Sequence, residues 1–159
     1  MADTSPITPR LVVTVDTEED NQWSPLQRGN LSINNILKLV NVHELFISQN
    51  FPLTYLVTYG VADRMEAVDL LKSLPEMRRC EIGSHLHAWS TPPWSSTPAD
   101  DIKIAKQQHL LSYTLEEEKI KCLTEKVRDA FGLTPKTFRA GRWAFTERCV
   151  KFLMERGYH

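Results

Sequence analysis

Two histidines one residue apart are the side chains in this sequence best suited to bind a metal ion. His85 and His87 end the segment Glu81–His87, which begins as a short apolar strand. Because side chains alternate along an extended backbone, both imidazoles would lie on the same side of the chain. Two neutral imidazole nitrogens on one side can bind a single divalent ion. The alternative is one loop histidine and one solvated histidine, because so short a motif also occurs by chance.

An acidic cluster follows another apolar run and could complete the metal site. Leu11–Val15 is β-branched and apolar, and Asp16 and Glu18 come directly after it. One carboxylate with two imidazoles is an open catalytic set for zinc or a related ion. A bound metal acidifies water, and a second carboxylate can take the proton as general base. Either Asp16 or Glu18 could be the ligand, with the other as base. We expect Glu19 and Asp20 to lie in a solvated turn.

A basic and aromatic segment near residue 140 could bind both the carboxylates and a substrate. Arg139 follows a short apolar strand, where a guanidinium can orient a carboxylate through paired hydrogen bonds. Its alternative is a salt bridge at the rim. Arg142 fits either a substrate contact or a surface cation. Trp89 and Trp143 could stack on a sugar ring, or could be partly buried packing residues.

Strands that alternate with helices must position these residues. This order predicts an α/β fold with a parallel sheet, in which ligand sites lie at the carboxyl ends of the strands. All three unusual clusters follow such ends. A long irregular stretch, 89–106, interrupts the pattern and is typical of a functional loop. The expected strands are 11–15, 53–57, 80–84 and 137–139, and the expected helices are 32–49, 63–74, 114–131 and 146–156.

Bulk properties describe an ordinary globular domain. The 159 residues are 42% hydrophobic and 25% charged, with a formal net charge of -1. We expect a flexible leader at 1–9 and one domain at 10–159. The chain lacks a basic patch and a long apolar run, so neither nucleic acid nor a membrane is an expected partner. Three scattered cysteines and no secretory signal favour a reduced compartment, so we expect a cytoplasmic protein.

Three ordered segments together resemble the polysaccharide deacetylase family, also called the NodB-homology or carbohydrate esterase 4 family. Thr14–Glu19 resembles the motif that supplies a catalytic base and an acidic metal ligand. Glu81–His87 resembles the motif with two metal-binding histidines, and Phe138–Trp143 the motif whose arginine orients the base. The resemblance covers nearly the whole chain. It implies a distorted (β/α) barrel, a divalent metal that we expect to be zinc, and removal of acetyl from an N-acetylated sugar or polysaccharide.

The resemblance assigns roles but also shows departures. It makes Asp16 the base and Glu18 the acidic ligand, although threonine separates them where the family has adjacent aspartates. The usual second histidine would fall at Trp89, whereas here it is His87. The pattern resembles a divergent branch of the family. Later motifs of the family would lie beyond residue 159, so we expect a chain that lacks the C-terminal strands.

Two other functions stay open at this point. The protein could be a catalytically degenerate carbohydrate-binding or assembly module of the same fold. It could also be a metal-independent amidohydrolase that acts on a cyclic ureide, as some relatives of the fold do. A shortened barrel would leave sheet edges unpaired, so the sequence also allows a homo-oligomer formed through those edges.

Overall fold

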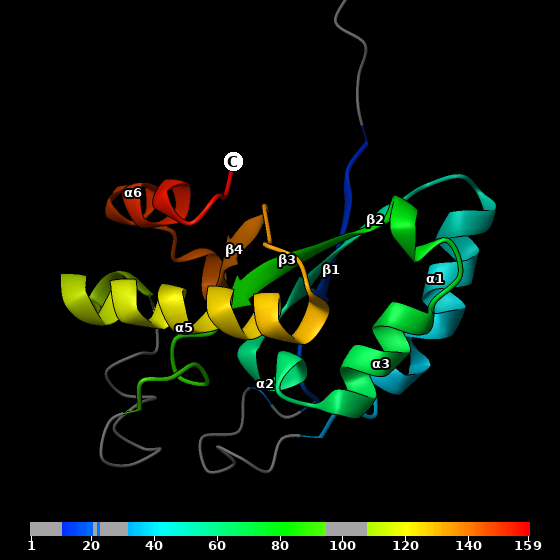
Figure 1. Ribbon diagram of the computed structural model, residues 1–159, viewed down its shortest axis with the longest axis horizontal. Coiled ribbons are helices and arrows are strands. Elements are labelled where there is room, and N and C mark those ends of the chain that lie inside the picture. The colour runs from blue at the N-terminus through cyan, green and yellow to red at the C-terminus, as the bar shows by residue number, and fades with distance from the viewer. Residues whose placement is uncertain (1–10, 21, 23–31, 95–107) are drawn as a thin grey trace, which may run out of the picture.

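The computed structural model describes residues 11–20, 22, 32–94 and 108–159. The expected leader at 1–9, and positions 95–106 of the irregular stretch, lie outside these residues. The described chain is mixed α/β and contains a curled four-stranded parallel sheet, a half-barrel (Figure 1). The strand order is β1-β2-β3-β4, which confirms the predicted parallel α/β architecture. The strands are β1 (Val13–Thr17), β2 (Leu53–Val57), β3 (Glu81–Leu86) and β4 (Phe138–Ala140).

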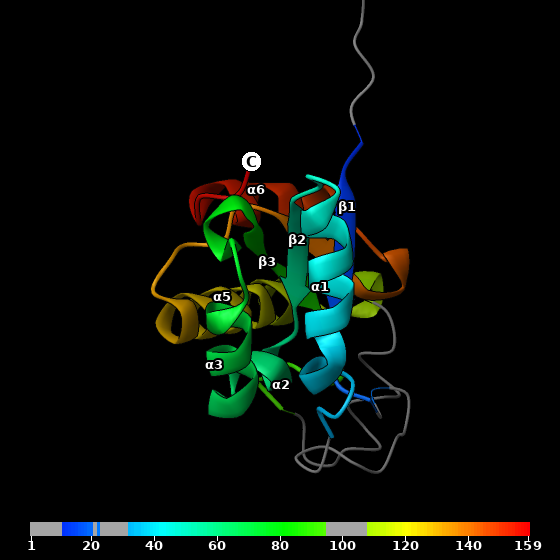
Figure 2. The ribbon, with the colours of Figure 1, turned by 90° about the vertical axis from the view of Figure 1, so that its right-hand side faces the viewer.

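Helices pack along the sheet between successive strands. Figure 1 shows α1 and α3 together at one side of the sheet and α6 at the other, and Figure 2 shows α1 alongside β2. The α-helices of the described chain are α1 (Leu39–Ser48), α2 (Tyr59–Ala62), α3 (Met65–Ser73), α5 (Tyr113–Phe131) and α6 (Glu147–Glu155). The 3₁₀ turns are η1 (Ile36–Lys38), η2 (Met77–Arg79), η3 (Gln108–Leu110) and η4 (Gly141–Trp143).

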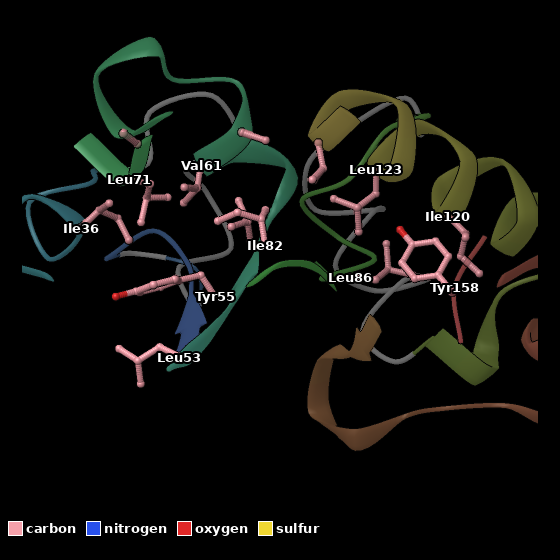
Figure 3. Packing of buried hydrophobic residues seen from close by; sticks show 14 of the residues in the cluster. Ile36, Leu53, Tyr55, Val61, Leu71, Ile82, Leu86, Ile120, Leu123 and Tyr158 are labelled. Atoms are coloured by element: carbon pink, nitrogen blue, oxygen red, sulfur yellow. The ribbon is translucent and has the colours of Figure 1, made fainter. Parts of the chain in front are cut away.

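The two faces of the sheet differ in chemistry. One face buries apolar side chains against the helices, among them Tyr55, Ile82 and Leu86 (Figure 3). Alternation places Thr14 and Asp16 on the opposite face. Burial of this apolar face holds the fold together, at about 25 cal/mol for each Å² removed from water. The polar face is left for the functional residues.

β1, β3 and β4 each begin and end one or two residues later than predicted, because strand pairing, and not hydrophobicity, sets their bounds. β1 begins at Val13, which pairs with the first residue of β2. Leu11 and Val12 precede this pairing and are exposed. β3 continues two residues beyond the predicted Ser84, because its last residues pair with β4.

Helix starts differ where side chains cap other backbone groups. The predicted helix from Ser32 begins later, because the Asp20 carboxylate accepts hydrogen bonds from the N–H groups of residues 34 and 35 at 2.9 and 3.0 Å. Those bonds fix a turn ahead of η1. Ser112 caps α5 in place of the predicted Thr114, through a 3.3 Å bond to the N–H of Leu115. Asp63 does not cap α3 but pairs with Lys126 of α5 at 2.6 Å.

Candidate functional site

The strand register brings the predicted site residues to one edge of the sheet. His85 on β3 pairs directly with Arg139 on β4. The row of paired residues that starts at Thr17 crosses β2 and ends at the residue before His85. Glu18 follows Thr17, so it lies level with His85. Glu18, His85 and Arg139 therefore lie at the same level at the carboxyl ends of three strands. This edge is where ligand sites form in parallel sheets.

Glu18, His85 and His87 form a compact group that could hold a metal ion. Their ligand atoms all lie within 4.8 Å of one another. Nε2 of His87 is 2.7 Å from Oε2 of Glu18 and 2.8 Å from Nε2 of His85. Nε2 of His85 is 3.5 Å from the same Glu18 oxygen. Both imidazoles are buried, with side chains 5% and 1% exposed.

The separations within the group are close to those of a tetrahedral metal site. Ligand bonds of about 2.0–2.1 Å place ligand atoms roughly 3.3 Å apart in such a site. The three separations here, 2.7, 2.8 and 3.5 Å, bracket that value. A further carboxylate, Asp16, lies just outside the group, with Oδ2 4.0 Å from Nε2 of His85.

A backbone carbonyl fixes the orientation of the His85 ring. Nδ1 of His85 lies 3.2 Å from the carbonyl oxygen of Arg139. A carbonyl can only accept, so Nδ1 donates to it, and Nε2 is the ring nitrogen directed at Glu18 and His87. Metal-binding histidines are commonly held by a second hydrogen bond of this kind.

Local electrostatics favour the protonation states that a metal ion requires. Burial by itself would raise the pKa of Glu18, but hydrogen bonds from His85 and His87 outweigh it and lower that pKa to about 2. Burial lowers the pKa of His87 by disfavouring its imidazolium form, and the hydrogen bond to Glu18 only partly opposes this. A carboxylate ligand and a neutral imidazole ligand are the forms that bind metal.

Arg139 holds Asp16 from the far edge of the sheet. One guanidinium nitrogen donates a short, charge-assisted hydrogen bond to Oδ1 of Asp16. Another donates to the hydroxyl of Thr14 at 2.7 Å. The contact links β4 with β1 across two intervening strands, which the curl of the sheet makes possible. The predicted pairing of Arg139 with a carboxylate is thus present in the structure, and its role in catalysis stays a prediction.

The turn after β4 packs closely against the end of β3. A Cβ at Gly141 would lie 2.6 Å from the carbonyl oxygen of Leu86 and 3.5 Å from Cα of His87, so only glycine fits without a shift. The next two residues, Arg142 and Trp143, have φ values of 57° and 56°. Non-glycine residues seldom adopt this left-handed conformation, which costs of order 1–3 kcal/mol each and clusters at functional sites.

This turn forms one wall of a cavity beside the metal-binding group. Arg142 lies with its Cζ 5.5 Å from the centre of the Trp89 ring, and Arg139 lies similarly over Trp143 at 5.2 Å. The Trp143 side chain is 83% exposed at the rim. The cavity has a volume of about 270 Å³ and is lined by Asp16, Glu18, His85, His87, Arg139, Ala140, Arg142 and Trp143.

Trp89 lies behind the cavity and is not among its lining residues. The side chain is buried, and its ring packs edge-on against His87 with the ring centres 4.4 Å apart. Nε1 donates to the carbonyl oxygen of Gln22 at 2.9 Å. Trp89 therefore supports His87 and Arg142, and its predicted contact with a substrate stays a prediction. Arg142 and Trp143 do line the cavity, and their predicted contacts with a substrate stay predictions.

Glu19 corrects the expectation of a solvated turn after β1. Its side chain is buried and accepts hydrogen bonds from the Thr58 hydroxyl at 2.7 Å and from the amide of Gln22. A Cβ at Gly60 would overlap the Glu19 carboxylate, so this glycine makes room for it. Glu19 thus anchors the segment that carries Glu18. Thr58 lies 39 residues away in the sequence, so no local signal could have revealed the contact.

Comparisons with known proteins give no independent assignment. A scan against protein-family models, a search of curated proteins and a search of solved structures each found no match. In the part of the chain that the structure describes, no helix is long and apolar enough to cross a membrane.

Proposed function

We propose that this protein is a metal-dependent hydrolase that removes the N-acetyl group from an acetylated amino sugar or polysaccharide. The observation that carries the proposal is the group Glu18, His85 and His87 beside Asp16, which Arg139 holds in place. The order of the three motifs, which resembles that of polysaccharide deacetylases, supplies the substrate class. The curled parallel sheet is compatible with the distorted (β/α) barrel of that family, and we propose that the protein has this fold.

The proposed roles divide the residues between metal binding and proton transfer. Glu18, His85 and His87 would hold the ion, which we propose to be zinc. A divalent ion bound there would polarise an acyl oxygen and acidify water. Asp16 is the general base, because its Oδ2 faces His85 while its Oδ1 is held by Arg139. Oδ2 would take the proton from a water molecule that attacks the acyl carbon, and would pass it to the amine nitrogen as the C–N bond breaks.

Metal analysis tests the proposed ligands. Purified protein should contain zinc, and the double variant His85→Ala/His87→Ala should lose it. The matched control is His109→Ala/His159→Ala, because both of these histidines are exposed and lie away from the group. Equal zinc content in the wild type and the His85/His87 variant would refute the metal site.

Acetate release then separates a hydrolase from a binding module. The zinc-loaded wild type should release acetate from N-acetylglucosamine oligomers, and Asp16→Asn should keep its zinc but act about 10²–10⁴-fold more slowly. The exposed Trp143 at the rim favours the second candidate, a carbohydrate-binding module without catalysis. Sugar binding by the wild type without acetate release would support that module. Activity that survives complete chelation would support the metal-independent amidohydrolase.

A further inference from the structure

Glu19 is a buried carboxylate that the proposed chemistry does not use. The residue is 3% exposed and directly follows the proposed ligand Glu18. Its two hydrogen-bond donors, the hydroxyl of Thr58 and the side-chain amide of Gln22, are both neutral. Among the described residues, nothing donates to its second oxygen, Oε1. A carboxylate buried without a cation is unfavourable, which indicates that its charge serves a positive group nearby.

The space that holds the Glu19 carboxylate is formed by segment 58–60, which follows β2. Thr58 is fully buried, and its N–H donates to the carbonyl of Thr17 at 3.1 Å, so its hydroxyl is held beside the end of β1. A Cβ at Gly60 would overlap Oε1 of Glu19, so the carboxylate occupies the space that a larger residue would need. A donor directed into a space of this size is expected for a fixed acid, and not for one that solvent satisfies.

Glu19 connects the two segments that carry the metal-binding group. It is the neighbour of Glu18, whose carboxylate lies 2.7 Å from Nε2 of His87. It also reaches the end of β3 through Gln22, whose backbone carbonyl accepts from Nε1 of Trp89 at 2.9 Å. The Trp89 ring in turn packs against His87. Movement of the Glu19 carboxylate would therefore disturb both a carboxylate and an imidazole of the group.

The charge of Glu19 also acts on the metal-binding group. Burial lowers the pKa of His87, and the hydrogen bond to Glu18 and the charge of Glu19 both oppose this shift. A field that reaches the imidazole also reaches an ion bound to it. Asp16 is already paired with Arg139, so Glu18 supplies only one negative charge to a divalent ion. Glu19 would supply the second, and the ion would be neutralised within the buried site.

We propose that Glu19 is a positioning residue of the metal site, which holds Glu18 and His87 in the arrangement that binds the ion and adds a negative charge beside it. The inference rests on the metal ion of the proposed function. It adds a second acidic residue, outside the ligands, that sets the affinity for this ion. Loss of such an outer partner commonly weakens metal binding about 10–100-fold.

Zinc affinity and stability, measured separately, test the inference. Glu19→Gln keeps the size of the side chain and removes its charge. In competition with a chromophoric chelator, this variant should bind zinc about tenfold more weakly than the wild type, or more weakly still. The metal-free variant should unfold at no lower urea concentration than the metal-free wild type, because it no longer buries an uncompensated charge. The control is Glu116→Gln, a buried carboxylate paired with Arg148, which should lose stability and keep its zinc affinity.

A second variant, Gly60→Ala, tests positioning without removing a charge. Its Cβ would displace the Glu19 carboxylate, so zinc binding should again weaken about tenfold. In the Glu19→Gln background the same alanine should add little to the loss of zinc affinity, because both substitutions act through one residue.

Each outcome has a separate meaning. Equal zinc affinity in Glu19→Gln and the wild type would overturn the inference and leave the proposed metal site intact. Loss of stability in Glu19→Gln and Gly60→Ala without loss of zinc affinity would show a purely structural role and would also overturn it. A wild type that binds no zinc would overturn both this inference and the proposed function. Weaker zinc binding in both variants, without acetate release from any sugar by the wild type, would sustain this inference and contradict the proposed hydrolase.

Discussion

Arg142 gives a direct test of strain at a single residue. Its φ of 57° is unfavourable for any side chain with a Cβ but not for glycine. Arg142→Ala and Arg142→Gly both lose the contact with Trp89, so their difference reports the backbone alone. We expect the glycine variant to be more stable than the alanine variant by about 1 kcal/mol, measured by urea unfolding. The same two substitutions at Arg128, inside α5, should give the reverse order, because glycine weakens a helix. Equal stabilities at position 142 would mean that the turn is not strained.

Among single residues, the sequence predicted those candidate site residues that lie at the carboxyl end of a strand. Asp16, Glu18, His85 and Arg139 could be predicted because parallel strands end at a common edge. Glu19 could not, since its burial depends on Thr58 from another strand end. The structure also resolves which carboxylate lies with the imidazoles: Glu18 belongs to the compact group and Asp16 lies beside it.

Among the elements, the junction of β4 with η4 positions the end of β3. Alanine at position 141 would bring a Cβ to 2.6 Å from the Leu86 carbonyl, and this backbone atom cannot move alone. We expect Gly141→Ala to shift His87, to weaken zinc binding about tenfold or more, and to destabilise the fold by roughly 1–3 kcal/mol. The control is Gly132→Ala, whose φ of 72° is strained but whose Cβ would meet nothing within 4 Å. That variant should lose about 1 kcal/mol of stability and keep its zinc affinity. If both variants bound zinc equally well, the turn would not position the ligands.

Element types were more predictable than element boundaries. The order of the four strands and the four longer helices was correct, because hydrophobic periodicity reports it directly. The short helix α2 was missed, because four residues capped by Thr58 give no periodic signal. The predicted starts of α3 and α5 were wrong because neither predicted capping residue caps its helix. Asp63 pairs with Lys126 instead, and Ser112 takes the capping position predicted for Thr114.

Across the whole molecule, curvature of the sheet turns separate strand ends into one site. A flat sheet of four strands would hold β1 and β4 about 14 Å apart, at 4.8 Å for each step. The bond from Arg139 to Asp16 instead joins these two strands directly. The sequence predicts that both residues lie at the same edge of the sheet. The curl of the sheet could not be predicted from the sequence, because it arises from the packing of the helices and the twist of every strand.

Tyr158 connects three distant parts of the fold, and its ionisation should lower the stability of the protein at high pH. Its hydroxyl lies 2.8 Å from that of Ser84 on β3 and 2.9 Å from that of Thr124 on α5. Burial raises the pKa of Tyr158, and the hydrogen bonds to Ser84 and Thr124 only partly oppose the shift. Because the folded pKa lies above the unfolded value of about 10, the unfolded chain loses this proton first as pH rises. The contribution of Tyr158 to stability is therefore complete below pH ~10 and is lost as pH rises through the folded pKa.

The variant Tyr158→Phe isolates this effect. Near pH 7 it should be less stable than the wild type by about 1 kcal/mol, since the hydroxyls of Ser84 and Thr124 lose their common partner. As pH rises above ~10, the wild type should lose up to about 1.4 kcal/mol per pH unit that the variant does not lose, so the gap should narrow. Urea unfolding of both proteins between pH 7 and 11 measures the two free energies of unfolding. The effect of the other titrating groups on the free energy of unfolding cancels in the comparison, because both proteins carry those groups. A gap that stayed constant or widened with pH would show that the Tyr158 hydroxyl ionises at least as readily in the folded protein as in the unfolded chain.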